Sequence, residues 1–194
     1  MDYIKLFNTI HKDFFNREYI KKLRVEEINT ELVLDLHNDF KDTQYSPYPS
    51  NIKFSEFKGN INLIKEAVRK VEKDWVQYFN KDELMFCGFD GDKIVSFCKI
   101  TDQGIIDGLH VGDPGCVGTI PEYRKQGIGL ELVRLATKLL KDDGFDISWI
   151  HGTPVPNWYT KLGYKPVLRW NKNGFIKWTT PNQKLLMELA SHLL

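Results

Sequence analysis

Cysteine is scarce in this sequence. Cys87, Cys98 and Cys116 are the three cysteines, and no two of them have C-x-x-C spacing. An odd number of cysteines in apolar surroundings argues against a disulfide framework and against a zinc site. We therefore expect free thiols, no bound metal and a reducing compartment, for which the cytoplasm is the default.

Net charge and long apolar runs are also lacking. The chain has 27 Lys and Arg against 26 Asp and Glu, a formal charge of +1. This balance gives no general attraction for nucleic acid or an anionic membrane, so a bound anion must be held by local groups. Charged residues interrupt the apolar N-terminus at Asp2, Lys5, Asp13 and Arg17, so we expect neither a signal peptide nor a membrane span.

The length and composition are those of one globular domain. The 194 residues are 42% hydrophobic and 13% aromatic, which is sufficient for one buried core. No internal repeat, linker or low-complexity run divides the chain. We predict a single domain over residues 1–194, with a helical extension at 1–18 and a terminal helix at 181–194. These apolar ends could pack against the core of the same chain or form the interface of a homodimer, and both alternatives stay open.

The first part of the chain has mixed periodicity. Residues 19–25 read as a short strand, and the stretch from Asn29 reads as a capped helix. Pro47 and Pro49 then mark an irregular loop. Apolar residues at intervals of three and four predict one long amphipathic helix over about residues 60–79.

The second part alternates strands and helices. Two apolar strands flank Asp90-Gly91, a dipeptide typical of a tight hairpin. The further elements that we predict are a Gly- and Asp-rich loop at 104–115, a strand at 115–120, a helix ending at Asp143, a strand at 145–151, a short helix ending at Gly163 and a terminal hairpin. This order predicts a mixed α/β sheet with one crossover at its centre.

The stretch YRKQGIG, residues 123–129, joins a predicted strand to a predicted helix. Because the helix begins near Gly127, its first N–H groups have no partner within the helix. Gly127 and Gly129 allow close approach of a ligand, and the helix dipole favours an anion, so a phosphate or pyrophosphate suits this turn. Arg124 and Lys125 add positive charge.

Two common glycine motifs do not fit this turn. A dinucleotide-binding fingerprint requires a third glycine at position 132, where this chain has Leu132. A Walker loop requires Gly-Lys-Ser/Thr, which is absent here. Tight packing of the strand against the helix remains an alternative for an isolated pair of glycines.

The longer stretch VGTIPEYRKQGIGLELVRLATKLL resembles the acyl-CoA pyrophosphate motif of the GNAT superfamily of N-acyltransferases. Arg124, Gly127 and Gly129 occupy the three defining positions of that motif. The downstream stretch NWYTKLGY is similar to the family's second motif, with Tyr159 and Gly163 at the matching positions. The resemblance covers roughly residues 84–168 and two motifs in the correct order, which makes a chance match improbable.

The resemblance implies a fold and a cofactor site. It implies a mixed, mainly antiparallel central sheet with a parallel strand pair splayed by a bulge, and helices on both faces. The pantetheine arm of acetyl-CoA would contact backbone groups near Val117 and Thr119. The residues that would hold the diphosphate are Arg124, Lys125, Gln126, Gly127, Ile128 and Gly129.

The resemblance also implies catalytic roles. Tyr159 would supply a proton to the departing thiolate, although a tyrosine there also suits simple packing. His151 is a candidate base for the acceptor amine because an ordinary histidine titrates near neutral pH, but it also suits a structural role. Proximity and a water chain serve some enzymes of this family without a strong base. Family members often have an asparagine several residues before this tyrosine, whereas here Asn157 lies only two residues before Tyr159 in a proline-rich stretch.

The activity that the resemblance implies is transfer of an acetyl group from acetyl-CoA to a primary amine of a small molecule, by direct attack in a ternary complex. The absence of a charged stripe gives slight support for a small acceptor over a peptide. A peptide or protein amine as acceptor and a non-catalytic acyl-CoA sensor remain alternatives. Acyl chain length and the identity of the amine stay open.

Overall fold

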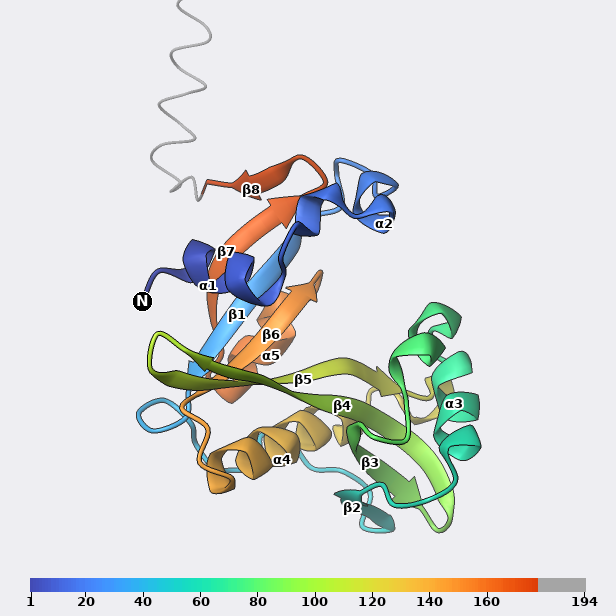
Figure 1. Cartoon of the computed structure of the whole chain (residues 1–194). Coiled ribbons are helices and arrows are strands. Elements are labelled where there is room, and N and C mark those ends of the chain that lie inside the picture. The colour runs from blue at the N-terminus through green and yellow to red at the C-terminus, as the bar shows by residue number, and fades with distance from the viewer. Residues whose placement is uncertain (178–194) are drawn as a thin grey trace, which may run out of the picture.

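A computed structural model describes residues 1–177 of the protein, and its centre is one eight-stranded sheet (Figure 1). The strands are β1 (Asn29–Asp35), β2 (Ile52–Glu56), β3 (Leu84–Asp90), β4 (Lys93–Ile106), β5 (Leu109–Thr119), β6 (Ile147–Thr153), β7 (Lys165–Asn171) and β8 (Gly174–Ile176). Their order in the sheet is β2-β3-β4-β5-β6-β1-β7-β8. Within residues 1–177 only β5 and β6 pair in parallel, so the sheet is mixed and mainly antiparallel, as predicted.

Helices cover both faces of the sheet (Figure 1). The helices are α1 (Tyr3–Ile10), α2 (Glu18–Lys21), α3 (Ile61–Arg69), α4 (Ile128–Asp142) and α5 (Pro156–Tyr159), with the 3₁₀ helices η1 (Phe14–Asn16), η2 (Lys73–Tyr78), η3 (Pro121–Tyr123) and η4 (Thr160–Leu162). Leu132 of α4 packs in one core with Leu32 and Leu34 of β1. Phe7 of α1 packs on the other face with Val33, because alternate strand residues point to opposite faces.

Strand β1 corrects the predicted helix from Asn29. Leu32, Leu34 and Leu36 alternate with residues of the opposite face, and all three are fully buried. A strand covered on both faces gives a nearly continuous apolar run, which by itself does not separate a strand from a buried helix. The strand lies between β6 and β7 and is antiparallel to both. This position brings an early part of the chain into the middle of the late strands.

Three other predictions for local structure were wrong. Residues 19–25 contain the end of helix α2 and a turn, and the long helix expected over residues 60–79 is divided into α3 and η2. The loop expected at 104–115 is the β4–β5 hairpin, which turns at Asp107-Gly108, two residues with positive φ. Glycines and aspartates within these strands concealed their extended conformation, since both residue types are uncommon in strands.

The parallel pair β5 and β6 separates after a short contact. Val111 pairs with Ile147 and Gly112 with Ser148, and no later residues of the two strands are paired. The register of β5 against β4 shifts beyond Lys99, where Cys116 has a left-handed φ of 49°. A bulge of this kind bends the strand away from its neighbour, so the predicted splay of the parallel pair is confirmed.

The remaining predicted elements of the second half occur as expected. Asp90-Gly91 turns the β3–β4 hairpin, and α4 ends one residue before Asp143 with Gly144 at φ 82°. The three cysteines are free thiols, as expected. The helix expected at 181–194 lies outside the described residues. None of the helices within residues 1–177 is both long and apolar enough to cross a lipid bilayer.

Candidate functional site

A cavity of about 670 Å³ opens at the N-terminus of α4, beside the end of β5 and helix α5. The residues that line it are Tyr45, Ser46, Val71, Val117, Gly118, Thr119, Tyr123, Arg124, Lys125, Gly127, Ile128, Gly129, Leu130, Val155, Trp158, Tyr159 and Lys161. All but two of the predicted site residues are among them. The exceptions are Gln126, whose amide donates a hydrogen bond to the Glu122 carbonyl at 3.2 Å, and His151.

The turn before α4 holds its backbone in an unusual conformation. Lys125 and Gly127 both have left-handed φ values, 62° and 78°. A lysine in this region is strained by roughly 1–2 kcal/mol, a cost that is most often found at functional sites. No side chain of residues 1–177 caps the start of α4. The first helical N–H groups therefore remain available to an anion in the cavity.

Packing explains part of the requirement for glycine. A Cβ atom at Gly127 would lie 2.4 Å from the carbonyl oxygen of Pro47, and one at Gly129 would lie 2.8 Å from the hydroxyl of Thr119. Tight packing, the alternative to a ligand site, is therefore real at both positions. Packing alone does not explain why both glycines also line the cavity at the start of α4.

The charges around this cavity have one sign. Arg124, Lys125 and Lys161 line it, and none of the described residues that line it is acidic. Arg124 is held in place because its Nε donates to the Thr119 carbonyl at 3.0 Å. Three cations beside an uncapped helix start form a cradle suited to a diphosphate. Lys161 could not be identified from the sequence, since nothing in its local pattern separates it from a surface lysine.

Two tyrosines of one motif differ in their hydroxyl groups. The hydroxyl of Tyr164 lies 2.7 Å from both the Thr137 and the Ser148 hydroxyls in the core. Tyr159 is 7% exposed and lines the cavity, and its hydroxyl has no hydrogen-bond partner among residues 1–177. Burial, followed by the neighbouring Tyr164 and Asp113, raises the pKa of Tyr159. Tyr159 therefore stays protonated near neutral pH.

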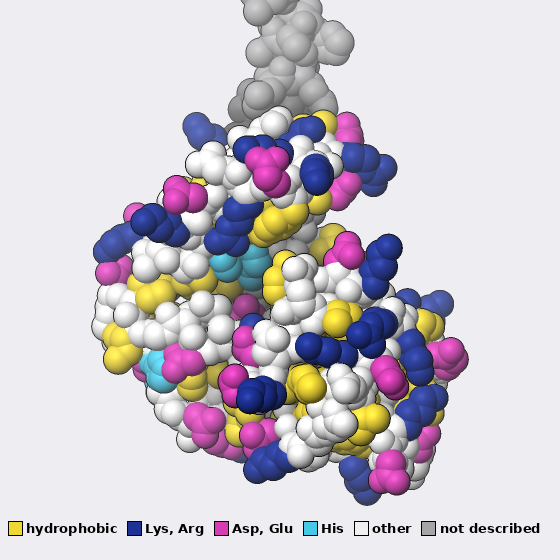
Figure 2. Space-filling model, turned by 45° about the vertical axis from the view of Figure 1, so that its right-hand side comes forward, with side chains coloured by type: hydrophobic (Ala, Val, Ile, Leu, Met, Phe, Trp, Pro, Cys, Tyr) yellow, Lys and Arg dark blue, Asp and Glu magenta, His cyan; other side chains and the backbone are white. Residues whose placement is uncertain are grey.

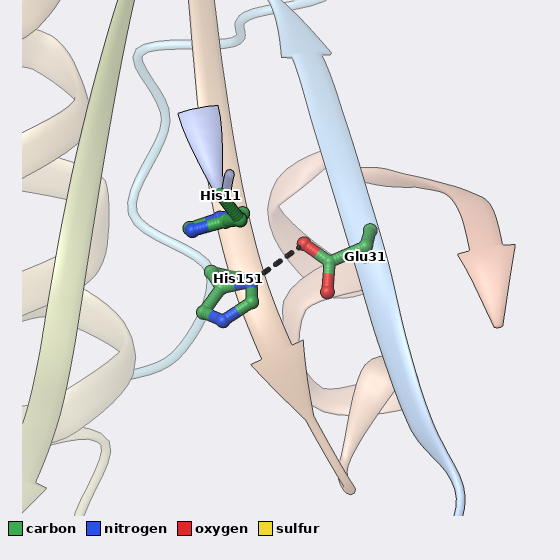
Figure 3. Close-up of side chains that lie close together, drawn as sticks. All are labelled: His11, Glu31 and His151. Atoms are coloured by element: carbon green, nitrogen blue, oxygen red, sulfur yellow. Dashed lines mark hydrogen bonds and ion pairs between the residues drawn. The ribbon is translucent and has the colours of Figure 1, made fainter. Parts of the chain in front are cut away.

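His151 belongs to the other face of the sheet. Its ring lies against α1, with the His11 ring at 3.8 Å between centroids, and its Nδ1 lies 3.1 Å from Oε2 of Glu31 (Figure 3). The side chain is 25% exposed. Figure 2 shows histidine side chains beside a hollow between the part of the molecule that carries β1 and β7 and the part that carries β3 to β5. The structure thus places His151 across the splayed strands from the cavity.

Asp113 of β5 lies between these two regions. Its side chain is 9% exposed, and its Oδ1 has no hydrogen-bond partner within the described chain. Burial raises the pKa of Asp113 to about 7, against the opposing effect of His151. Its charge in turn raises the pKa of both His151 and Tyr159. Asp113 is therefore a common neighbour of the two predicted catalytic residues, although the sequence placed it in a predicted loop.

The large aromatic side chains fall into two groups, those that line the cavity and those that are packed in the core. Trp158 and Tyr45 line the cavity. Trp149 and Trp170 are buried and both donate to the carboxylate of Glu31. The loop with Pro47 contributes Tyr45 to the cavity, whereas Tyr48 of the same loop packs edge-on against Phe54 at the core.

Residues 36–164 match the family model described as "Acetyltransferase (GNAT) family". This match covers more than half of the chain and includes both sequence motifs. It also includes β2 to β6 and the cavity at the start of α4. No curated protein matches the sequence.

Solved structures share the fold at low identity. A region of a fungal multi-domain GH3 beta-N-acetylglucosaminidase, described as a GCN5-related glucosamine N-acetyltransferase, superposes with a TM-score of 0.61 at 19% identity, over 75% of this chain and 20% of that chain. A GCN5-related N-acetyltransferase from Sphaerobacter thermophilus gives 0.57 at 18% identity, over 76% and 51%. One from Kribbella flavida gives 0.52 at 22% identity, over 74% and 56%. The chain thus spans little more than half of these proteins at most.

Proposed function

The chain belongs to the GNAT acetyltransferase family, and we propose that it transfers an acetyl group from acetyl-CoA to a primary amine of a small molecule. One observation supports this most strongly. The start of α4, which no side chain of residues 1–177 caps, and three cations line the same cavity as the hydroxyl of Tyr159, which has no hydrogen-bond partner within those residues. The cavity thus offers both an anion cradle and a proton donor.

The residues of the cavity fit acetyl-CoA on chemical grounds. The amides of Ile128, Gly129 and Leu130, together with Arg124 and Lys125, would hold the diphosphate. Backbone groups near Val117 and Thr119, in the strand that the bulge turns away from β6, would receive the pantetheine arm. When bound, acetyl-CoA supplies the acetyl group as an activated thioester.

Tyr159 and His151 have complementary roles in the proposal. His151, on the opposite side of the splay, takes a proton from the acceptor amine as the amine forms its bond to the acetyl carbon. Tyr159 donates its proton to the sulfur as the carbon–sulfur bond breaks. Both proton carriers are then reset through solvent.

The cysteine side chains favour direct transfer over an acyl-cysteine route. Burial raises the pKa of Cys87 and of Cys116 to about 12, and burial also raises that of Cys98. A thiol must be deprotonated to act as a nucleophile. We therefore propose direct attack by the amine in a ternary complex.

The test is acetyl-CoA-dependent release of free thiol in the presence of candidate acceptors. The panel contains aliphatic amines, an amino sugar, free amino acids and lysine-containing peptides. Thiol release with one of the small amines is the expected result. Release with the peptides alone would replace the small acceptor by a peptide, and saturable binding of acetyl-CoA without release over the panel would indicate a sensor.

A further inference from the structure

Glu31 is a buried carboxylate with an unusually complete set of partners. It is 0% exposed, and four N–H groups point to it. Oε2 accepts from Trp149 Nε1 at 2.7 Å and lies 3.1 Å from His151 Nδ1, while Oε1 accepts from the Gly152 N–H at 2.9 Å and from Trp170 Nε1 at 2.6 Å. All four partners can donate, which suits an ionised carboxylate because such a group only accepts.

The strand order creates this arrangement. Because β1 lies between β6 and β7, Glu31 faces Trp149 and His151 on one side and Trp170 on the other. Neither edge of the sheet could provide donors from two flanking strands. A buried carboxylate with no partner would be strongly destabilising, so these donors offset the cost of its burial.

The contact with Glu31 determines which ring nitrogen of His151 is free. Since the carboxylate is an acceptor, Nδ1 of His151 carries a proton and donates to it. Nε2 of the neutral ring is then left with a lone pair, which is the form a general base requires. Figure 3 shows the carboxylate of Glu31 on one side of the imidazole of His151 and the ring of His11 beside it, tilted by 30°.

Four groups set the electrostatic surroundings of His151. They come from different elements: Glu31 from β1, Asp113 from β5, His11 from the end of α1 and Arg17 from the turn after η1. Burial lowers the pKa of His151, but the charge and hydrogen bond of Glu31 and the charge of Asp113 outweigh it, so that the pKa is raised. Burial, then His151 and Arg17, lowers the pKa of His11 to about 3, so the neighbouring ring of His11 is neutral.

A metal ion is the alternative occupant of this cluster. One ligand atom from each of His11, Glu31 and His151 lies within 4.8 Å of the others. The carboxylate of Glu31, however, already has two N–H partners on each oxygen. A metal bound there would displace the donors that make its burial tolerable. The donor set therefore favours acid–base chemistry.

We propose that Glu31 is the positioning residue of the acceptor side, which fixes the ring of His151 by its hydrogen bond to Nδ1 and thereby directs Nε2 toward the acceptor amine. This inference rests on the proposed function. As the amine nitrogen forms its bond to the acetyl carbon, its proton passes to Nε2, and the imidazolium that results is paired with the carboxylate of Glu31. The proton leaves to solvent after the transfer.

The first test compares Glu31→Gln with wild type in the pH profile of kcat/KM for one acceptor. Because only neutral His151 can accept a proton, wild-type activity rises as pH increases through its raised pKa. Glu31→Gln removes the charge that raises this pKa, so the rise should move to lower pH, and kcat on the plateau should fall about 10- to 100-fold. The same acceptor in both enzymes cancels the titration of the amine itself.

Glu131→Gln is the matched control. Glu131 is a second buried glutamate, 4% exposed, but it pairs with Arg134 on α4. Its loss should leave the position of the pH profile unchanged. A Glu31→Gln enzyme that keeps the wild-type profile, whatever its rate, would overturn the proposal, since a purely structural glutamate changes stability and not this profile.

The second test needs neither acceptor nor acetyl-CoA. The imidazole of His151 is titrated by NMR, with its signal assigned through His151→Gln. We expect a lower pKa in Glu31→Gln, and an unchanged pKa would refute the coupling even if acetyl transfer is confirmed. Should Glu31→Gln fail to fold, Glu31→Asp withdraws the carboxylate by one methylene and should lower the pKa of His151 partway; no change would again refute it. A protein without transferase activity would instead refute the proposed function, whatever the titration shows.

Discussion

The two sides of the splayed strands treat their polar groups in opposite ways. On the α4 side, the first helical N–H groups are uncapped and the Tyr159 hydroxyl is unpaired within residues 1–177. On the α1 side, Glu31 has two N–H partners on each oxygen. Groups left open in a cavity are available to a ligand, whereas groups that are fully paired hold their neighbours in place. This difference separates residues that bind from residues that position.

Filling the open side should have the largest effect. Gly129→Trp places an indole in the first turn of α4, beside the cavity. Even a Cβ atom at this position would lie 2.8 Å from the Thr119 hydroxyl. We expect the affinity for acetyl-CoA, measured by calorimetry, to fall about a thousandfold or more. Asp143→Trp, at the exposed far end of α4, is the control and should bind normally. Unchanged affinity of a folded Gly129→Trp protein would remove the diphosphate from this cavity.

The two tyrosines distinguish an open hydroxyl from a paired one. Tyr159→Phe removes the unpaired hydroxyl, so kcat should fall about 10- to 1,000-fold with little change in acetyl-CoA affinity. Tyr164→Phe removes the hydroxyl that contacts Thr137 and Ser148 and should lower the free energy of unfolding by about 1–3 kcal/mol while the folded enzyme keeps its kcat. Steady-state kinetics and chemical denaturation distinguish the two. Full activity of Tyr159→Phe would exclude it as the proton donor.

Asp113 tests the boundary between the two sides through the pH dependence of stability. Its pKa is raised from 3.8 to about 7 in the folded protein. The folded state therefore holds a proton that the unfolded state has lost, and the stability of wild type decreases as pH rises through this range. Asp113→Asn lacks this decrease, so relative to wild type its free energy of unfolding should gain about 4 kcal/mol between roughly pH 4 and pH 8. If the difference in the free energy of unfolding between the two proteins were the same at both pH values, the pKa of Asp113 would not be raised in the folded protein.

Lys125 should give the smallest effect. It lines the cavity, but its charge is partly screened by solvent. Lys125→Ala is expected to weaken acetyl-CoA binding about two- to fivefold, with a smaller dependence on salt than wild type shows. Calorimetry at low and high ionic strength measures both. A variant with the same salt dependence as wild type would place the lysine outside the diphosphate site.

The two sides also differ in how well the sequence predicts them. The α4 side is built mainly from two contiguous stretches, residues 117–130 and 155–161, so its turn, its helix, Arg124 and Lys125 could be inferred from local spacing. The other side joins Glu31 to His151 across 120 positions of the chain. That contact depends on β1 lying between β6 and β7, and the apolar run of β1 was predicted to be a helix. No local pattern distinguishes a glutamate destined for such a position.

The fold shows the same division between local and tertiary signals. The amphipathic pattern of α4 and the Asp90-Gly91 turn are local signals, and both predicted the structure correctly. The β4–β5 hairpin is stabilised by pairing between strands that contain glycine and aspartate, so its conformation is set by tertiary contacts instead of propensity. Asp113 was hidden by this error, because its strand was taken for a loop.

The most direct test of the central claim is a calorimetric titration of the wild-type protein with acetyl-CoA, with NADH and ATP as controls. We expect saturable binding of acetyl-CoA with a dissociation constant in the micromolar range. CoA without the acetyl group should also bind, whereas NADH and ATP should show no comparable binding. Absence of binding, or equal affinity for NADH, would contradict the assignment of this cavity to acetyl-CoA and leave the two glycines explained by packing alone.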